Sequence, residues 1–343
     1  MPSPLPPELW QPILDHLHDD TTALCTTSLI CRAWLHITRH HLFSTITLTP
    51  KRLLRSVQLN SLLASPHTTI PTAVRSLKLP GALVLGTVPR GTHTASAGLI
   101  TGYTPLDLRS VAPRLADLQN VREISLTDVP TTLLATLPNL ERLNLSNVAS
   151  TSISRALRLL PRLRHLELEN VSFTPIVFSA AQDPGPAAFP TAVETVVIRR
   201  SNLKLLPQQL AIWSSNVAVL AIDRIYAREL PYLEQYLVAI SSTLRELHLC
   251  ITGGDIDATK FPVLLESCKS LQLLYLRFTT PADVRRFFAG ATVLVHRAAD
   301  MQLVVAIERV GSDAQSAIGL EDLIKTWGVE FRIEIGLSSL LMR

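Results

Sequence analysis

The sequence predicts an α/β repeat fold, in which a small three-helix module at the N-terminus precedes an irregular solenoid of strand–helix units. Three observations predict it. Residues 5–43 carry apolar side chains at helical spacing. From residue 74 onward the pattern apolar-x-x-apolar-x-apolar recurs eight times, at intervals that suit a strand plus a helix. Prolines outnumber glycines, at 23 against 13, which is typical of many short elements and argues against glycine-rich phosphate loops.

The first helix of the module is predicted from its apolar face. Leu9, Ile13 and Leu17 recur every fourth residue, which places them on one side of a helix. Pro7 suits the first turn, where its missing N–H would be unpaired in any case. Pro12 interrupts the pattern, because a proline inside a helix costs about 3 kcal/mol, so we expect a kink or a slipped hydrogen bond there.

Two more helices follow in the first 48 residues. Asp19 or Asp20 can cap a second helix over residues 21–29, and a third leads from residue 33 to residue 43. A helical cluster of about 45 residues lies near the lower limit of independent stability. We therefore expect the module to expose apolar surface that a partner covers.

These residues also stand in the order and at the spacing of a known motif. The matching positions are Leu5-Pro6-Pro7-Glu8-Leu9, Ile13-Leu14-x-x-Leu17, Leu24, Ser28-Leu29-Ile30-Cys31-Arg32-Ala33-Trp34 and Arg39-x-x-Leu42-Phe43. The run resembles an F-box, most closely those abundant in mushroom-type fungi, and it covers about one eighth of the chain.

The F-box resemblance implies a function for the module. Members of the family bind a Skp-type adaptor and so join a cullin-based ubiquitin ligase core. Carried over to this sequence, the adaptor-binding positions are Leu5, Pro6, Leu9, Ile13 and Leu14, together with Leu29, Ile30 and Trp34. The alternative is that these side chains only pack the three helices together.

The rest of the chain is organised by the recurring hexad. Its copies are Val74–Leu79, Val121–Leu126, Leu140–Leu145, Leu163–Leu168, Val193–Ile198, Val217–Ile222, Leu244–Leu249 and Leu271–Leu276. Their starts are separated by 47, 19, 23, 30, 24, 27 and 27 residues. Four of these seven spacings lie in the range of about 20 to 29 residues that leucine-rich repeats use. An eroded copy at residues 103–108 could divide the longest one.

This part resembles the leucine-rich-repeat domains that often follow an F-box. It departs from the commonest repeat at the ninth position, where asparagine or cysteine is frequent and this chain has residues such as Val148, Ser201 and Thr279. An internal asparagine ladder at that position is therefore absent. The alternative is an ordinary α/β domain with repeated β–α units.

The remaining segments complete the predicted organisation. Residues 302–308 and 331–335 read as strands with a helix near residues 313–327 between them, and residues 81–102 and 183–190 read as loops. The predicted domains are an F-box module at 1–48, a linker helix region at 49–73 and a leucine-rich-repeat-like, substrate-binding domain at 74–343.

A target-binding face is predicted from the alternation of strand side chains. Residues flanking the fourth and sixth hexad positions point away from the core. The candidates for target binding on this face are Arg142, His165, Arg199, Tyr275 and Arg277. We expect them to grip a protein segment, with the arginines meeting an acidic or phosphorylated group. The alternative is that the C-terminal tail covers this face.

Several function classes are disfavoured. Basic residues are dispersed at a net charge of +4, which does not favour nucleic-acid binding. No apolar stretch is long enough to span a membrane. Four scattered cysteines favour reduced thiols, and His36, His40 and His41 lack a partner set for a metal. No catalytic motif is present, so we expect no catalytic residue, no metal and no cofactor.

The sequence therefore predicts a non-catalytic substrate-recognition adaptor of a cullin-type ubiquitin ligase, in the cytoplasm or nucleus. Its expected partners are a Skp-type adaptor with the cullin ligase core, and an unknown target protein. Two alternatives stay open: a ligase-independent interaction scaffold, and an enzyme hidden in the repeat-like part.

Overall fold

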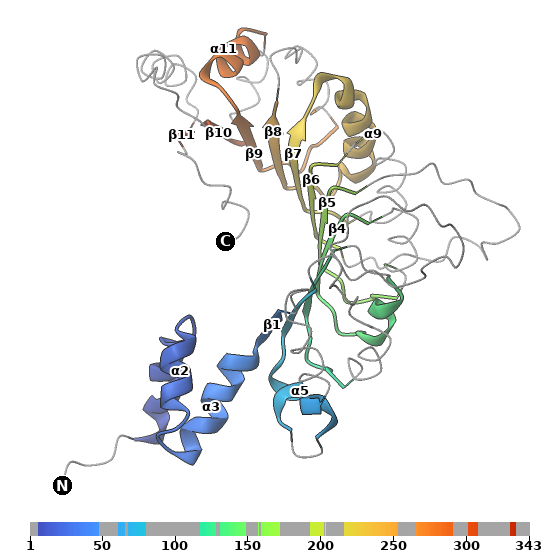
Figure 1. Cartoon of the computed structure of the whole chain (residues 1–343). Helices are drawn as coiled ribbons and strands as arrows, with labels where there is room; N and C mark the ends of the chain where they lie inside the picture. The colour runs from blue at the N-terminus through green and yellow to red at the C-terminus, as the bar shows by residue number, and fades with distance from the viewer. Residues whose placement is uncertain are drawn as a thin grey trace, which may run out of the picture. The chain divides into compact units, whose positions relative to one another are not determined.

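The computed structural model describes residues 6–47, 61–65, 68–79, 117–127, 131–148, 157, 159–171, 193–201, 203, 216–252, 265, 267–290, 301–307 and 330–333 (Figure 1). The chain divides into two compact units, Met1–Val148 and Ala149–Arg343. The predicted boundary at residue 48 and much of the predicted linker at 49–73 lie outside the described residues.

The first unit begins with a cluster of short helices. A 3-10 helix η1 (Pro7–Leu9) leads into α1 (Trp10–Asp15), followed by α2 (Thr21–Thr27) and α3 (Arg32–Phe43). The Asp20 carboxylate accepts a hydrogen bond of 2.9 Å from the Ala23 N–H and caps α2, so of the two predicted caps, Asp19 and Asp20, the second is the one used. Pro12 falls within the first turn of α1, where its missing N–H leaves no intrahelical bond unmade.

The helices of the first unit lead directly into a parallel sheet. Strand β1 (Thr45–Thr47) follows α3 after one residue and pairs with β2 (Ser76–Leu79), which pairs with β3 (Glu123–Thr127) and through it with β4 (Arg142–Ser146). Helix α5 (Ile70–Ala73) precedes β2, and the 3-10 helix η3 (Thr131–Thr136) connects β3 to β4.

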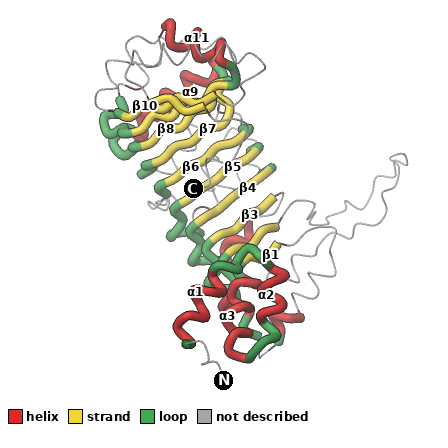
Figure 2. The backbone as a smooth tube through the Cα atoms, turned by 90° about the vertical axis from the view of Figure 1, so that its left-hand side faces the viewer, coloured by secondary structure: helices red, strands yellow, loops and turns green. Residues whose placement is uncertain are grey.

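The second unit contains a parallel sheet whose strands follow one another in chain order. Its strands are β5 (His165–Glu169), β6 (Thr195–Arg199), β7 (Val219–Ile225), β8 (Glu246–Ile251), β9 (Leu273–Phe278), β10 (Gln302–Ile307) and β11 (Glu330–Ile333). Each described pairing joins neighbours in sequence, in parallel. Figure 2 shows β5, β6, β7 and β8 side by side in that order. The helical connections are η5 (Ala227–Glu229) with α9 (Leu230–Ile240), and α11 (Pro281–Gly290).

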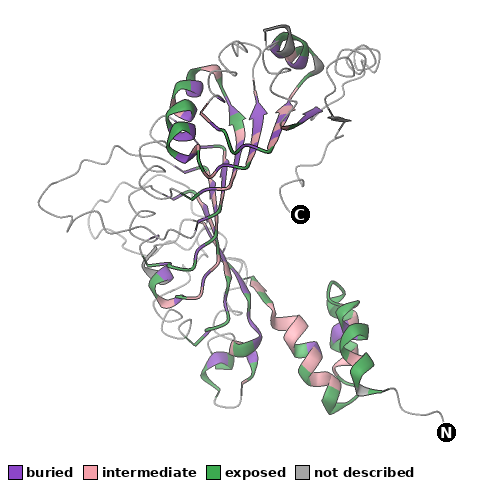
Figure 3. Cartoon of the chain, turned by 180° about the vertical axis from the view of Figure 1, so that it is seen from behind, coloured by how far each residue is buried: buried purple, intermediate pink, exposed green. Residues whose placement is uncertain are grey.

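Alternation along the strands separates a core side from an open face. In β9, Leu274, Leu276 and Phe278 are fully buried, and they alternate with the half-buried Leu273, Tyr275 and Arg277. Figure 3 shows buried and less buried stretches along the strands. The same alternation runs through β5 and most of β8. The core side is closed by helices with apolar faces, since the buried residues of α9 recur at spacings of three and four.

Polar side chains tie together the turns at the amino edge of the strands. At four places among the described residues, the residue before the first hexad position donates a hydrogen bond to a carbonyl of the preceding turn. These bonds are Asn120 Nδ2 to Thr72 O (2.8 Å), Asn139 Nδ2 to Gln119 O (3.0 Å), Thr243 Oγ1 to Val217 O (3.0 Å) and Ser270 Oγ to Ser242 O (3.1 Å). Polar side chains therefore link successive turns from the position before the hexad, and not from the ninth position, where leucine-rich repeats commonly carry asparagine.

The carboxyl edge uses tight turns with left-handed backbone. Asn147, Asn170 and Arg200 each follow directly after a strand and have φ of 57°, 50° and 50°. Asparagine visits this region more readily than most residues, because its short amide can bond locally. Ser201 then fastens the turn after β6, since its hydroxyl accepts from the Val171 N–H (3.0 Å) and donates to the Arg199 carbonyl (2.9 Å).

The predicted fold class, a small three-helix F-box followed by an irregular leucine-rich-repeat-like solenoid, is wrong. The structure has an α/β fold built on parallel strands with few helices among the described residues. Two physical reasons stand out. The N-terminal helices are not a free-standing module, because α3 runs into β1 and β1 is bonded to β2. The hexads specify strands, but the described connection between β3 and β4 contains a 3-10 helix, Thr131–Thr136, where a repeat of this kind would place an α-helix.

The strand predictions themselves are confirmed at all eight hexads. Those at 302–308 and 331–335 are confirmed over residues 302–307 and 331–333, and their remaining residues lie outside the described ones. The eroded copy at 103–108, the loops at 81–102 and 183–190 and the helix at 313–327 lie outside the described residues.

Candidate protein-docking surfaces

The helical cluster has a very small core of its own. Of the described residues 6–47, those buried are Leu14, Leu24 and Thr38. The Thr38 hydroxyl bonds back to the Trp34 carbonyl at 2.8 Å, and the Trp10 and Trp34 rings meet edge to face with centroids 6.5 Å apart. Two buried leucines and one aromatic pair stabilise three helices only modestly, which leaves much of their apolar surface uncovered.

The uncovered surface includes large aliphatic side chains. Four of the eight exposed large hydrophobic residues in the described part of the chain lie between residues 9 and 30. Leu9 and Ile13, here called the first-helix pair, are 48% and 39% exposed and one helical turn apart. Leu29 and Ile30, here called the turn pair, follow α2 and are 85% and 63% exposed. Such a concentration in a short segment is typical of a protein-interaction site.

The predicted adaptor-binding residues divide into three groups. Pro6, the first-helix pair and the turn pair are exposed. Trp34 is half-buried against Trp10, and Leu14 is fully buried. Leu14 therefore packs the cluster and does not belong to its exposed surface. Leu5 lies outside the described residues.

The segment that carries the two exposed pairs is acidic. Two histidines, His40 and His41, lie in the last turn of α3, next to the first strand of the sheet. Glu8, Asp15, Asp19 and Asp20 are exposed, and residues 6–31 contain no lysine or arginine. Asp15 Oδ1 lies 3.0 Å from His41 Nε2, which links α1 to the last turn of α3. The neighbouring His40 ring meets that of His41 edge to face, at 5.8 Å between centroids.

This arrangement predicts a loss of stability in acid. Burial lowers the pKa of His40 below its ordinary value of 6.5, and the charges of Arg75, His41 and His36 lower it further, whereas Asp15 acts in the opposite sense. Because the unfolded chain then binds a proton more readily, this contribution is complete above about pH 6.5 and declines as the pH falls below it. Urea unfolding of the full chain should therefore have a lower midpoint at pH 5.5 than at pH 7.5. His40→Gln should flatten this dependence, and an unchanged dependence would contradict the assignment.

The open face of the second unit carries a second candidate surface. The Tyr275 ring on β9 stacks on His248 of β8, with centroids 5.4 Å apart and planes at 28°. In the next register position toward the carboxyl ends, Cys250 and Ala306 flank Arg277 on the adjoining strands. Aromatic and guanidinium groups on a half-buried sheet face are the side chains that most often anchor protein partners.

The five predicted target-binding residues do not form one set. Tyr275 and Arg277 are brought together on β9, and both are half-buried. Arg199 is bound by Glu167, with 2.8 Å between Nε and Oε1, so its charge is largely neutralised within the chain. His165 lies at the start of β5, and Arg142 is exposed on β4 in the first unit. Of the five predicted residues, Tyr275 and Arg277 are the two that share one strand, β9.

Sequence reasoning missed His248 in this site. The signal was available, because His248 stands between hexad positions four and six of its strand, as Tyr275 does in the next. In parallel strands at equal register those positions are neighbours, and the observed partners are His248 and Tyr275.

Comparison with known proteins does not assign a family or a function to this chain. The chain matches no protein-family model and no curated protein. Within the described residues, no three His, Cys, Asp or Glu side chains gather as a metal site would require. The helices that the structure describes are too short or too polar to cross a bilayer.

Proposed function

We propose that the chain is a non-catalytic adaptor that brings a target protein to a cullin-type ubiquitin ligase, in the cytoplasm or nucleus. Its helical cluster would bind a Skp-type adaptor, and its parallel sheet would bind the target. The observation that carries the proposal is the exposure of the first-helix and turn pairs on a cluster with little core. The resemblance of residues 5–43 to an F-box supports a Skp-type adaptor as the partner that covers them.

Two further features support a binding role for the sheet. The His248–Tyr275 stack holds two ring faces on the open side of the second unit, and Arg277 adds a guanidinium one position along the same face. An adaptor of this kind acts by raising the effective concentration of a bound target near the transfer machinery, so it needs no catalytic group of its own.

The proposal is tested by association of the purified full chain with a purified Skp-type adaptor. Size-exclusion chromatography with light scattering should show a one-to-one complex at micromolar concentration. Leu9→Ser combined with Ile13→Ser should reduce complex formation. The melting temperature of the chain, measured without the adaptor, should stay unchanged. Two unassociated proteins at that concentration would exclude the ligase assignment.

A further inference from the structure

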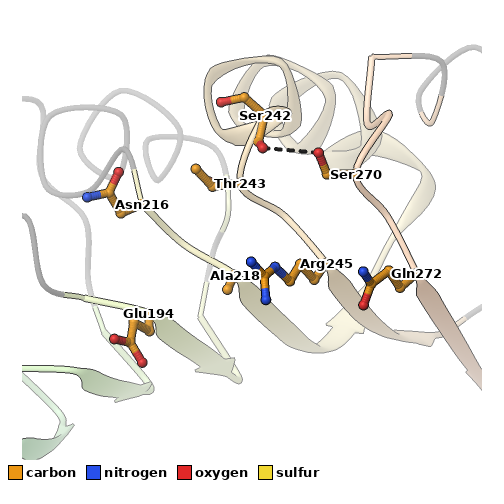
Figure 4. A pocket seen from close by; sticks show the side chains of 8 residues that line it. All are labelled: Glu194, Asn216, Ala218, Ser242, Thr243, Arg245, Ser270 and Gln272. Atoms are coloured by element: carbon orange, nitrogen blue, oxygen red, sulfur yellow. Dashed lines mark hydrogen bonds between the residues drawn. The ribbon is translucent and has the colours of Figure 1, made fainter.

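A polar hollow lies at the amino edge of the sheet in the second unit. It has a volume of about 820 Å³. Figure 4 shows the side chains that line it. Its lining comes from the residues at or just before the starts of β6, β7, β8 and β9, which are Glu194, Asn216, Ala218, Ser242, Thr243, Arg245, Ser270 and Gln272.

The register of the strands produces the hollow. Glu194, Ala218, Arg245 and Gln272 each immediately precede a strand, and backbone bonds hold them in one row. The Glu194 carbonyl accepts from Ala218 N–H at 2.8 Å, and the Ala218 carbonyl accepts from Arg245 N–H at 2.8 Å. The methyl group of Ala218 therefore separates two long charged side chains. With about 4.8 Å between strands, the Cα atoms of Glu194 and Arg245 are roughly 10 Å apart.

Two charged side chains, Glu194 and Arg245, lie at the sides of this hollow. Glu194 and Arg245 are both exposed, and neither side chain forms an ion pair or a side-chain hydrogen bond within the described part of the chain. The backbone beneath them is satisfied, because the same carbonyls also accept from the first N–H of the next strand. Their charges thus contribute little to folding and are free to meet a ligand.

The remaining lining consists of hydroxyl and amide groups. Ser270 donates to the Ser242 carbonyl and Thr243 donates to the Val217 carbonyl, which fixes the wall formed by two successive turns. Gln272 is exposed beside Arg245 and offers an amide donor and acceptor. A lining of this kind suits the N–H and C=O groups of an extended peptide better than an apolar small molecule.

We propose that this hollow binds an extended peptide segment that carries one acidic and one basic side chain about three residues apart. An extended chain advances about 3.3 Å per residue, so three residues span the roughly 10 Å between Arg245 and Glu194. Arg245 pairs with the acidic side chain and Glu194 with the basic one. The proposal concerns a different surface from the adaptor-binding helices and does not depend on them.

The test uses two labelled six-residue peptides, acetylated and amidated, with one glutamate and one lysine three positions apart in a serine–glycine chain. The two peptides differ only in the order of the charges. Fluorescence anisotropy with the full chain should show that one order binds better. Glu194→Lys or Arg245→Glu alone removes one exposed ion pair and adds a repulsion, so each should weaken binding of the preferred peptide by at least roughly 1.4- to 5-fold.

The decisive comparison is the double variant Glu194→Lys with Arg245→Glu, which should invert the preference between the two peptides. A matched control reverses Glu234 and Arg286, which are exposed outside the hollow, and should leave the preference as it is in the original chain. Equal binding of both orders, binding of neither peptide, or a preference that survives the double reversal would each overturn the proposal. No adaptor is present in this experiment, so its outcome is separate from that of the proposed function.

Discussion

Replacing the turn pair with serine, as Leu29→Ser with Ile30→Ser, is expected to weaken binding of the Skp-type adaptor by at least about 100-fold. Both side chains are largely exposed in the free chain. Burying an aliphatic side chain of this size in an interface stabilises a complex by about 1.5–3 kcal/mol, so losing two costs about 3–6 kcal/mol. The dissociation constant, measured by isothermal titration with the purified adaptor, reports this loss.

The stability of the free chain should hardly change in this variant, because both side chains of the turn pair are mostly exposed in it. Val238→Ser is the matched control, since Val238 is an exposed aliphatic residue on α9 of the second unit and should leave adaptor affinity unchanged. If the turn-pair variant binds as tightly as the original chain, the docking surface has been assigned to the wrong residues. If it unfolds, the pair belongs to the core of the cluster.

The largest effect on stability is expected from Phe278→Ala in the second unit. Phe278 is fully buried at the end of β9, and its ring meets that of Phe287 on α11 edge to face at 5.3 Å between centroids. Truncating a buried phenylalanine costs about 3–5 kcal/mol, because apolar area returns to water and a cavity remains. Urea unfolding monitored by circular dichroism should show this loss as a lower midpoint.

Tyr275→Ala on the same strand supplies the comparison. Tyr275 points to the open face, and its stacking on His248 is worth about 0.5–1.5 kcal/mol beyond its buried area. Tyr275→Ala combined with Arg277→Ala should therefore cost much less than Phe278→Ala, while it weakens capture of the target. A cost equal to that of Phe278→Ala would mean that the open face is covered in the native chain.

The strands could be read from the sequence because their signal is local. In a strand such as His165–Glu169, Leu166 and Leu168 face the core and the residues between them do not, so alternation alone locates it. The Asp20 cap was predictable for the same reason, since its acceptor and donor are three residues apart. Neither prediction depends on where the rest of the chain goes.

The architecture could not be read in this way, because it depends on contacts between distant segments. The pairing of Ile46 with Leu77 joins the strand after α3 to the sheet. No local sequence pattern predicts a pairing between residues so far apart in the chain. The intervals between hexads suited a strand plus a helix, whereas the described connection at Thr131–Thr136 is a 3-10 helix. The ion pair between Arg199 and Glu167 joins neighbouring strands and becomes visible only once their register is known.

The central claim is that an undersized helical cluster at residues 6–43 exposes apolar surface that a Skp-type adaptor covers. Amide hydrogen exchange of the full chain, with and without saturating adaptor, tests it most directly. Slower exchange should appear in peptides that contain Leu9–Ile13 and Leu29–Ile30, with no change in α9 or α11. Protection confined to the second unit, or no protection anywhere, would contradict the claim.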